Sequence, residues 1–141
     1  MSSIEIVVPS DQLIQQSVSE SDTTDATTNW VKMKEIRVAF TGGCRVKYAF
    51  RSTGGAGLHY ANIYVNGSPA GTQQRLGAGN QAASIAIENI YGLKPGDLIQ
   101  IYVSDEVGNT NIRISSFVLT GSYQTVPRFV TAGTVTLADA A

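Results

Sequence analysis

The segment from Trp30 to Thr120 reads as one β-strand after another, and this pattern constrains the fold more than any other feature of the chain. Apolar and polar residues alternate with a period of two, as in Ile99, Ile101 and Val103, which is typical of strands with one buried face. Asn66-Gly67 and Lys94-Pro95-Gly96-Asp97 carry the glycines that tight turns need at positive φ. About seven or eight such strands, spaced by roughly 8–12 residues, indicate an all-β antiparallel sandwich or barrel.

Two local patterns refine this prediction. Ile36, Val38 and Phe40 alternate with polar or small residues, and after a Thr-Gly-Gly connection the alternation resumes over residues 44–50, which predicts a β-hairpin. The apolar residues of segment 30–34 are out of phase with those from Ile36 onward. A β-bulge near Lys34-Glu35 would bring the two phases together.

The low charge of the chain limits its partners. Only 15% of the residues are charged, against about 25% in typical globular proteins, and the formal net charge is −1. A balanced charge argues against nucleic acids and anionic membranes, because both are bound through excess positive charge. No apolar run approaches the roughly 20 residues of a membrane-spanning helix. The N-terminus lacks the features of a signal peptide, so we expect a soluble protein made in a cytoplasm.

The chain divides into three predicted parts: an N-terminal strand and polar arm (1–29), a β-sandwich core (30–121) and a C-terminal tail (122–141). In the arm, residues 4–8 predict a strand that Pro9 ends, and residues 11–16 suit a helical turn. Residues 17–29 are too polar to order themselves without a partner. In the tail, residues 130–137 predict a last strand.

The sequence offers no catalytic or metal-binding constellation, so we expect neither an enzyme nor a cofactor. His59 has no neighbours at metal-ligand spacing, and Cys44 lies on an apolar strand face where an inert thiol is expected. The glycine-rich segment 54–57 lacks the Gly-Lys-Ser/Thr ending of a phosphate-binding loop. Three acidic residues near turns lack the spacing of a calcium loop and are expected to cap those turns: Asp97, Asp105 and Glu106.

Five residues in the outward phase of two strands are the candidates for an interface or ligand contact: Tyr60, Asn62, Tyr64, Gln100 and Tyr102. Tyrosine combines a large apolar area with a polar tip at little cost in entropy, which suits glycan platforms and protein interfaces alike. Three interpretations stay open: a packed second face of the sandwich, a subunit interface, or a ligand site.

The strand and turn patterns of residues 30–38, 45–52, 61–72 and 92–103 resemble jelly-roll-like β-sandwich modules of tailed-phage virion proteins, including head decoration (cement) proteins and tail or fibre components. The resemblance covers about residues 27–121. It implies a jelly-roll-like sandwich of about eight strands with extended terminal arms, a homotrimer and a structural role in the virion. The chain is short and has no repetitive shaft, which favours a small accessory capsid protein over a complete fibre.

The main functional prediction is therefore a bacteriophage decoration protein that binds the major capsid protein or other virion proteins and stabilises the head. Its arms would add strands to neighbouring edges and slow dissociation through avidity. Removing residues 1–29 would then leave the core folded. The residues expected to make the arm contacts are Ile4, Ile6, Val7, Val8 and Phe129.

The alternative prediction is a carbohydrate- or receptor-binding module of a tail fibre, collar or head fibre. Its glycan contacts would come from Tyr60, Tyr64 and Tyr102, with the loops at residues 52–57 and 73–81.

Overall fold

The computed structural model describes residues 2–7, 13–19, 21–23, 29–52, 57–76, 83–106, 112–121 and 123–128. These residues form twelve strands, and none of them forms a helix that could cross a membrane. The strands are β1 (Ser2–Val7), β2 (Leu13–Ser17), β3 (Ser21–Thr23), β4 (Val31–Arg37), β5 (Thr41–Ser52), β6 (His59–Val65), β7 (Ser68–Pro69), β8 (Gln74–Leu76), β9 (Ser84–Leu93), β10 (Leu98–Asp105), β11 (Ile112–Thr120) and β12 (Tyr123–Arg128).

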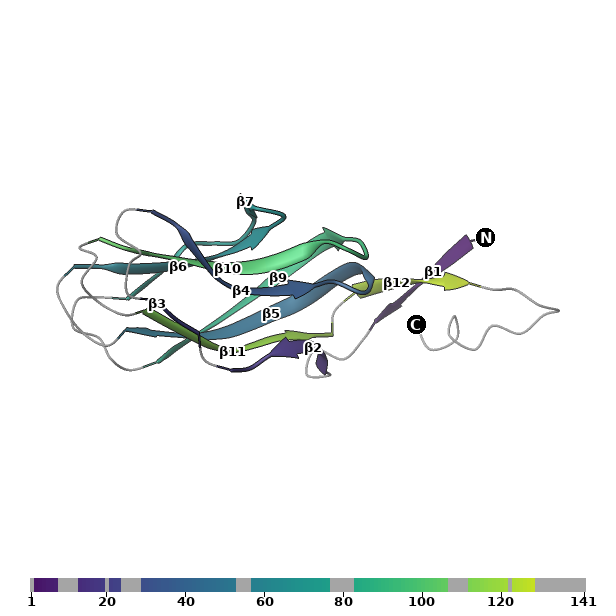
Figure 1. Ribbon diagram of the computed structural model, residues 1–141. Coiled ribbons are helices and arrows are strands. Elements are labelled where there is room, and N and C mark those ends of the chain that lie inside the picture. Colours follow the sequence, from purple (N-terminus) through teal and green to yellow (C-terminus); the bar gives the residue numbers. More distant parts are fainter. Residues whose placement is uncertain are drawn as a thin grey trace.

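The strands form two antiparallel sheets that lie face to face (Figure 1). The large sheet has seven strands in the order β1-β12-β5-β11-β2, with β9 paired to β5 and β3 paired to β11. The small sheet has five strands in the order β4-β10-β6-β7, with β8 paired to β6. The predicted all-β, jelly-roll-like antiparallel sandwich is confirmed. Strands β3, β7 and β8 have three residues or fewer, which is too short for periodicity to reveal them.

The core lies between the sheets and is built from the inward-facing residues of the central strands. Fully burying an aliphatic or aromatic side chain of this kind stabilises the fold by about 1.5–3 kcal/mol. The buried side chains on β5, β10 and β11 are Val46, Tyr48, Phe50, Ile99, Ile101, Val103, Ile112, Ile114, Phe117 and Leu119.

Both predicted turns are confirmed. Asn66 and Gly67 join β6 to β7 with φ values of 52° and 83°, and a two-residue type I′ turn requires positive φ at both positions. Gly96 has a φ of 94°, and the amide of Asp97 donates to the carbonyl of Lys94 at 3.1 Å, closing the second turn.

The predicted hairpin between residues 36–40 and 44–50 is wrong. Strand β4 pairs with β10 in the small sheet, whereas β5 pairs with β9, β11 and β12 in the large sheet. Val38 stays with the small sheet, since its amide donates to the carbonyl of Asp97 at 2.7 Å and its carbonyl accepts from the amide of Gly96 at 2.8 Å. The chain then crosses to the other layer. Alternation specifies which face of a strand is buried, but it leaves the pairing partner open.

The predicted bulge in β4 is confirmed. Ile101 of β10 lies opposite Lys34, but the next residue, Tyr102, lies opposite Lys32, so Met33 is the extra residue. Lys34 is buried, whereas Lys32 and Glu35 are exposed. The bulge therefore turns Lys34 away from the solvent-facing side and brings Lys32 and Glu35 to that side together.

The region before the core is bound to it through hydrogen bonds. Residues 13–17 form β2, paired with β11, so the predicted helical turn over residues 11–16 is wrong where the structure describes it. Lys34 Nζ donates to the carbonyl and hydroxyl oxygens of Ser17, each at 2.9 Å, and to Ser19 Oγ at 3.3 Å. Gln15 bonds to the backbone of Arg37 and Ala39 at 2.7 and 3.1 Å. These polar contacts hold β2 in place together with Ile14, which is partly buried and packs against the core.

The first and the last described strands pair with each other. Strand β1, which contains Ile4, Ile6 and Val7, pairs with β12 from Ser2–Arg128 to Val7–Tyr123, and both strands extend beyond one end of the sandwich (Figure 1). The strand predicted over residues 4–8, before Pro9, is observed as β1, which ends at Val7. Val8, Phe129 and the strand expected over residues 130–137 lie outside the described residues. Strand addition to a neighbouring molecule and the division into arm, core and tail stay predictions.

Candidate functional site

The five residues singled out in the sequence come together on the solvent-facing side of the small sheet, here called the outer face. Gln100 lies opposite Tyr64 in the β10–β6 ladder, and Tyr102 lies opposite Asn62. Tyr60 lies opposite Ser104, nearer the far end of the ladder. The outer face also receives Lys32 and Glu35 from β4, which pairs with the other edge of β10.

An aromatic cluster of Trp30, Tyr64 and Tyr102 occupies this face. The rings of Tyr64 and Tyr102 stack with their centroids 4.1 Å apart and an interplanar angle of 22°. Trp30 contacts Tyr64 with a centroid distance of 6.0 Å and a tilt of 45°. Only 8% of Tyr64 is exposed, whereas Trp30 and Tyr102 are half-buried. Tyr64 therefore supports the cluster, and Trp30 and Tyr102 present its accessible surface.

Trp30 was not among the residues selected from the sequence. It directly precedes the first residue of β4 and is separated from Lys34 and Glu35 by the bulge. The alternation of buried and exposed residues in the rest of the strand therefore does not show which face Trp30 is on. Its proximity to Tyr64 depends on the pairing of β4 with β10, which sequence patterns do not specify.

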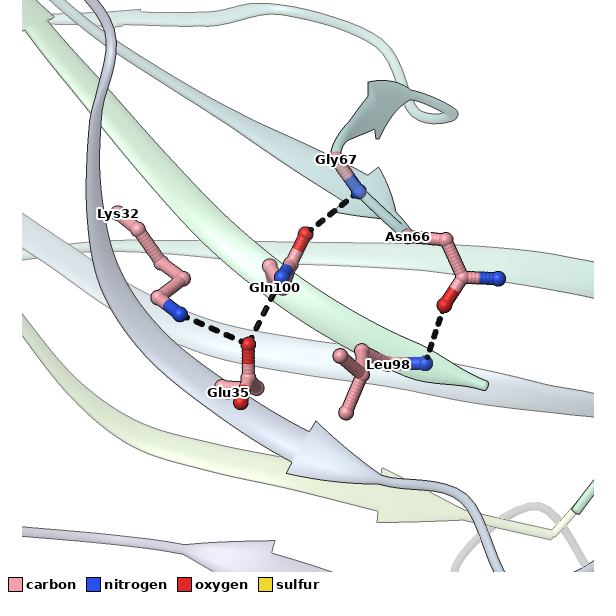
Figure 2. A network of polar contacts seen from close by, with 6 residues as sticks. All are labelled: Lys32, Glu35, Asn66, Gly67, Leu98 and Gln100. Atoms are coloured by element: carbon pink, nitrogen blue, oxygen red, sulfur yellow. Dashed lines mark hydrogen bonds and ion pairs between the residues drawn. The ribbon is translucent and has the colours of Figure 1, made fainter. Parts of the chain in front are cut away.

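A polar network lies beside the aromatic cluster (Figure 2). Lys32 Nζ and Glu35 Oε2 form an ion pair at 2.9 Å, and Gln100 Nε2 donates to the same carboxylate oxygen at 2.8 Å. Gln100 Oε1 in turn accepts from the amide of Gly67 at 2.9 Å. The bond from Gln100, and then the one from Lys32, lower the pKa of Glu35, while the bond to Glu35 raises the pKa of Lys32. Both groups are therefore charged at neutral pH.

The two turns close one end of the outer face. Leu98 N donates to Asn66 Oδ1 at 2.9 Å (Figure 2), and Asn66 N donates to the carbonyl of Leu98 at 2.9 Å. The carboxylate of Asp97 accepts from Asn66 Nδ2 at 3.1 Å and from the amide of Lys94 at 3.0 Å. These two bonds lower the pKa of Asp97. Asp97 thus caps its turn, as the sequence predicts, and stiffens this end of the site.

Asn62 and Tyr60 contribute less to an accessible surface. Asn62 is 8% exposed, and its Oδ1 accepts from the following amide, Ile63 N, at 2.8 Å. Tyr60 is half-buried and donates its hydroxyl proton to Glu106 Oε2 at 3.5 Å. Asn62 therefore offers little accessible surface, and Tyr60 belongs to the opposite end of the face.

Three further candidates for chemistry are in the interior: His59, Asp105 and Cys44. His59 and Asp105 lie opposite each other on β6 and β10, fully buried, with His59 Nδ1 3.2 Å from Asp105 Oδ1. Because both side chains are fully buried, they are not part of the outer face. Cys44 is also fully buried, and burial raises the pKa of its thiol to about 12. In the described parts of the chain, no three His, Cys, Asp or Glu side chains form a group that could hold a metal ion.

No family model matches the chain, and no curated protein matches its sequence. Its fold is similar to that of the C-terminal domain of EclA, described as a sugar-binding protein, with a TM-score of 0.52 and 8% identity over 81% of each chain.

Two carbohydrate-binding modules are also similar. One is the CBM36-1 domain of a xylanase from the hindgut metagenome of Trinervitermes trinervoides, with a TM-score of 0.44 and 9% identity over 92% of this chain and 100% of that domain. The other is a CBM36 module in complex with calcium and xylotriose, with a TM-score of 0.44 and 10% identity over 87% of this chain and 99% of that module. Because their TM-scores lie below 0.5, the similarity in fold rests on the EclA domain.

The similarity to the EclA domain supports the jelly-roll-like sandwich, but it does not relate the chain to a virion protein. The role in capsid decoration, the homotrimer and the location in the virion stay predictions.

Proposed function

We propose that the chain is a non-catalytic carbohydrate-binding module that binds glycans on the outer face of the small sheet, across Tyr102 and Trp30. The observation that carries this proposal is the stacked Tyr64–Tyr102 pair, 4.1 Å between centroids, with a network of charged and amide groups beside it. It corresponds to the carbohydrate-binding alternative predicted from the sequence.

The chemistry of a sugar ring fits this arrangement. One face of a pyranose ring presents C–H groups, which pack on an aromatic ring, while its hydroxyl groups point outward around the edge. Tyr102 and Trp30 supply aromatic surface, and Lys32 and Glu35 supply a donor and an acceptor at its border. Charge-assisted hydrogen bonds of this kind are stronger than bonds between neutral groups.

The site is also held in place before any ligand binds. Tyr64 packs against Tyr102, and Gln100 is fixed at both ends of its amide by Glu35 and Gly67. A site whose side chains are already ordered loses less conformational entropy on binding. Because Glu35, Gln100 and Tyr102 lie on strands along the face of a sheet, the surface suits an extended sugar chain.

The similarity in fold to the EclA domain, whose description is that of a sugar-binding protein, supports the same reading. The proposal agrees with the alternative prediction from the sequence, a carbohydrate-binding module of a tail fibre, collar or head fibre, and leaves its location in a virion as a prediction.

The test is a glycan array, followed by calorimetric titration of the glycan that binds best. Tyr102→Ala should weaken binding about tenfold or more, since truncating a central aromatic contact costs about 2 kcal/mol. Tyr91→Ala is the matched control, because Tyr91 is 65% exposed but lies on β9 of the large sheet. The proposal is wrong if the array shows no binding, or if the Tyr91 variant loses as much affinity as the Tyr102 variant.

A further inference from the structure

We propose that the outer face of the small sheet selects uncharged glycans over acidic ones, and that the Lys32–Glu35 ion pair beside Tyr102 determines this selection. The inference rests on the proposed function and adds to it the class of glycan and the residues that discriminate.

The bulge in β4 creates the pair. In a regular strand, residues three apart point to opposite faces. The extra residue, Met33, shifts the register so that Lys32 lies opposite Tyr102 and Glu35 lies opposite Gln100, both on the outer face. Their side chains then meet at 2.9 Å. The ion pair is therefore held beside the accessible ring of the aromatic cluster by the backbone itself.

Glu35 is also restrained from the neighbouring strand. Gln100 is only 5% exposed and donates to Glu35 Oε2 at 2.8 Å, while its own oxygen accepts from Gly67 N at 2.9 Å. Because Gly67 N is a donor, the amide of Gln100 is oriented with its NH₂ group toward Glu35. The carboxylate is thus placed by β4, β10 and the β6–β7 turn together.

The pair is accessible to a ligand. The side chain of Lys32 is 46% exposed and that of Glu35 is 34% exposed. A sugar hydroxyl can accept from the ammonium and another can donate to the carboxylate without separating the two charges. An uncharged glycan therefore gains charge-assisted hydrogen bonds at little cost.

An acidic glycan has no such gain. A carboxylate that approaches Lys32 also approaches Glu35, so attraction and repulsion of similar size largely cancel. The other charges on this face lie farther along it. Arg37 lies opposite Leu98 at the turn end, and Arg75 lies opposite Tyr60, whose hydroxyl contacts Glu106, at the other end. The charge of Arg37 also contributes to lowering the pKa of Glu35, but Lys32, and not Arg37, lies opposite Tyr102, so the charges next to Tyr102 are those of the ion pair.

The test compares wild type, Glu35→Gln and the double variant Lys32→Gln/Glu35→Gln. Glutamine at position 35 keeps an oxygen that can accept from Gln100 but removes the negative charge, which leaves Lys32 unpaired. The double variant has similar side-chain sizes and no charge at either position. The probes are β-1,4-linked hexamers that differ only at C6, cellohexaose against hexaglucuronate and mannohexaose against hexamannuronate, alongside the uncharged and acidic glycans of the array.

Wild type should bind uncharged glycans at least tenfold more tightly than acidic ones. Glu35→Gln should gain at least tenfold in affinity for acidic glycans. The gain should disappear in 0.5 M salt, where the Debye screening length is roughly 4–5 Å. The double variant should show no gain, which separates the effect of charge from a change in packing.

Equal affinity of wild type for both classes, or no gain for acidic glycans in Glu35→Gln, would overturn the inference while leaving the proposed function intact. If wild type binds no glycan of either class, the proposed function fails and this inference fails with it.

Discussion

Asn66 Nδ2 donates to Asp97 Oδ1 at 3.1 Å, and this bond joins two turns that lie 31 positions apart in the chain. The other atom of the Asn66 amide, Oδ1, accepts from Leu98 N at 2.9 Å. Asn66 is in the left-handed region with a φ of 52°, where asparagine is tolerated better than most residues. The two turns therefore act as one unit at the edge of the outer face.

This unit predicts a pH-dependent contribution to stability. The bonds from Asn66 and from the Lys94 amide lower the pKa of Asp97 in the folded state, so the unfolded chain takes up this proton at a higher pH. The stabilisation is present above the unfolded pKa of about 3.9 and is lost as the pH falls through the lower, folded value. Urea unfolding should show wild type more stable than Asp97→Asn at pH 7, with the difference shrinking towards pH 2. A constant difference across that range would contradict the role of the charge.

The sandwich core predicts a contrast between two isoleucines. Ile101 is fully buried on β10, so Ile101→Ala should lower the free energy of unfolding by about 2–5 kcal/mol. Ile87 is 57% exposed on β9, and Ile87→Ala should change it by less than about 0.5 kcal/mol. Denaturant titrations of the two variants measure both values. Similar losses would mean that the face carrying Ile87 is covered in solution.

The contacts of Lys34 predict that the first 29 residues support the core. Lys34 is 6% exposed, and its ammonium donates only to Ser17 and Ser19 among the contacts found in the described part of the chain. Deleting residues 1–29 removes these acceptors together with strands β1, β2 and β3. The buried ammonium alone should then cost about 1–3 kcal/mol.

A shorter deletion, of residues 1–12, keeps these contacts and is the matched control. It should cost less than the longer deletion in a thermal or urea unfolding experiment. If the chain without residues 1–29 unfolds at the same urea concentration as the full chain, the expectation of a separable arm is correct and the support inferred from Lys34 is not.

Burial of Cys44 predicts an unreactive thiol. Desolvation raises the pKa of this thiol to about 12, so the nucleophilic thiolate is scarce at neutral pH. A thiol reagent such as 5,5′-dithiobis(2-nitrobenzoic acid) should label Cys44 at pH 8 only in denaturant. Stoichiometric labelling of the native protein within minutes would show that this part of the core opens readily.

Local sequence signals predicted the local structure. The buried faces of β5, β6 and β10, the turns at Asn66-Gly67 and Lys94–Asp97, and the bulge in β4 all follow from periodicity or turn chemistry within a few residues. Each depends on backbone preferences or on the burial of one face, which neighbours in sequence determine.

Pairing between distant strands could not be predicted in the same way. Residues 36–50 read as a hairpin because nothing in their alternation shows that β4 and β5 belong to different sheets. For the same reason, the sequence placed Tyr64 and Tyr102 on outward faces but did not show that they stack, or that Trp30 joins them. Predicting the Lys32–Glu35 pair would have required the position of the bulge to within one residue, because a shift by one residue moves a side chain to the other face of the sheet.

The most direct test of the account is an NMR titration of the ¹⁵N-labelled chain with the uncharged glycan that binds best on the array. The account predicts chemical-shift changes concentrated at the backbone amides of Lys32, Gln100 and Tyr102 and at the indole N–H of Trp30. Changes concentrated on β9 of the large sheet, around Ile85 and Tyr91, with the outer face of the small sheet unaffected, would contradict it.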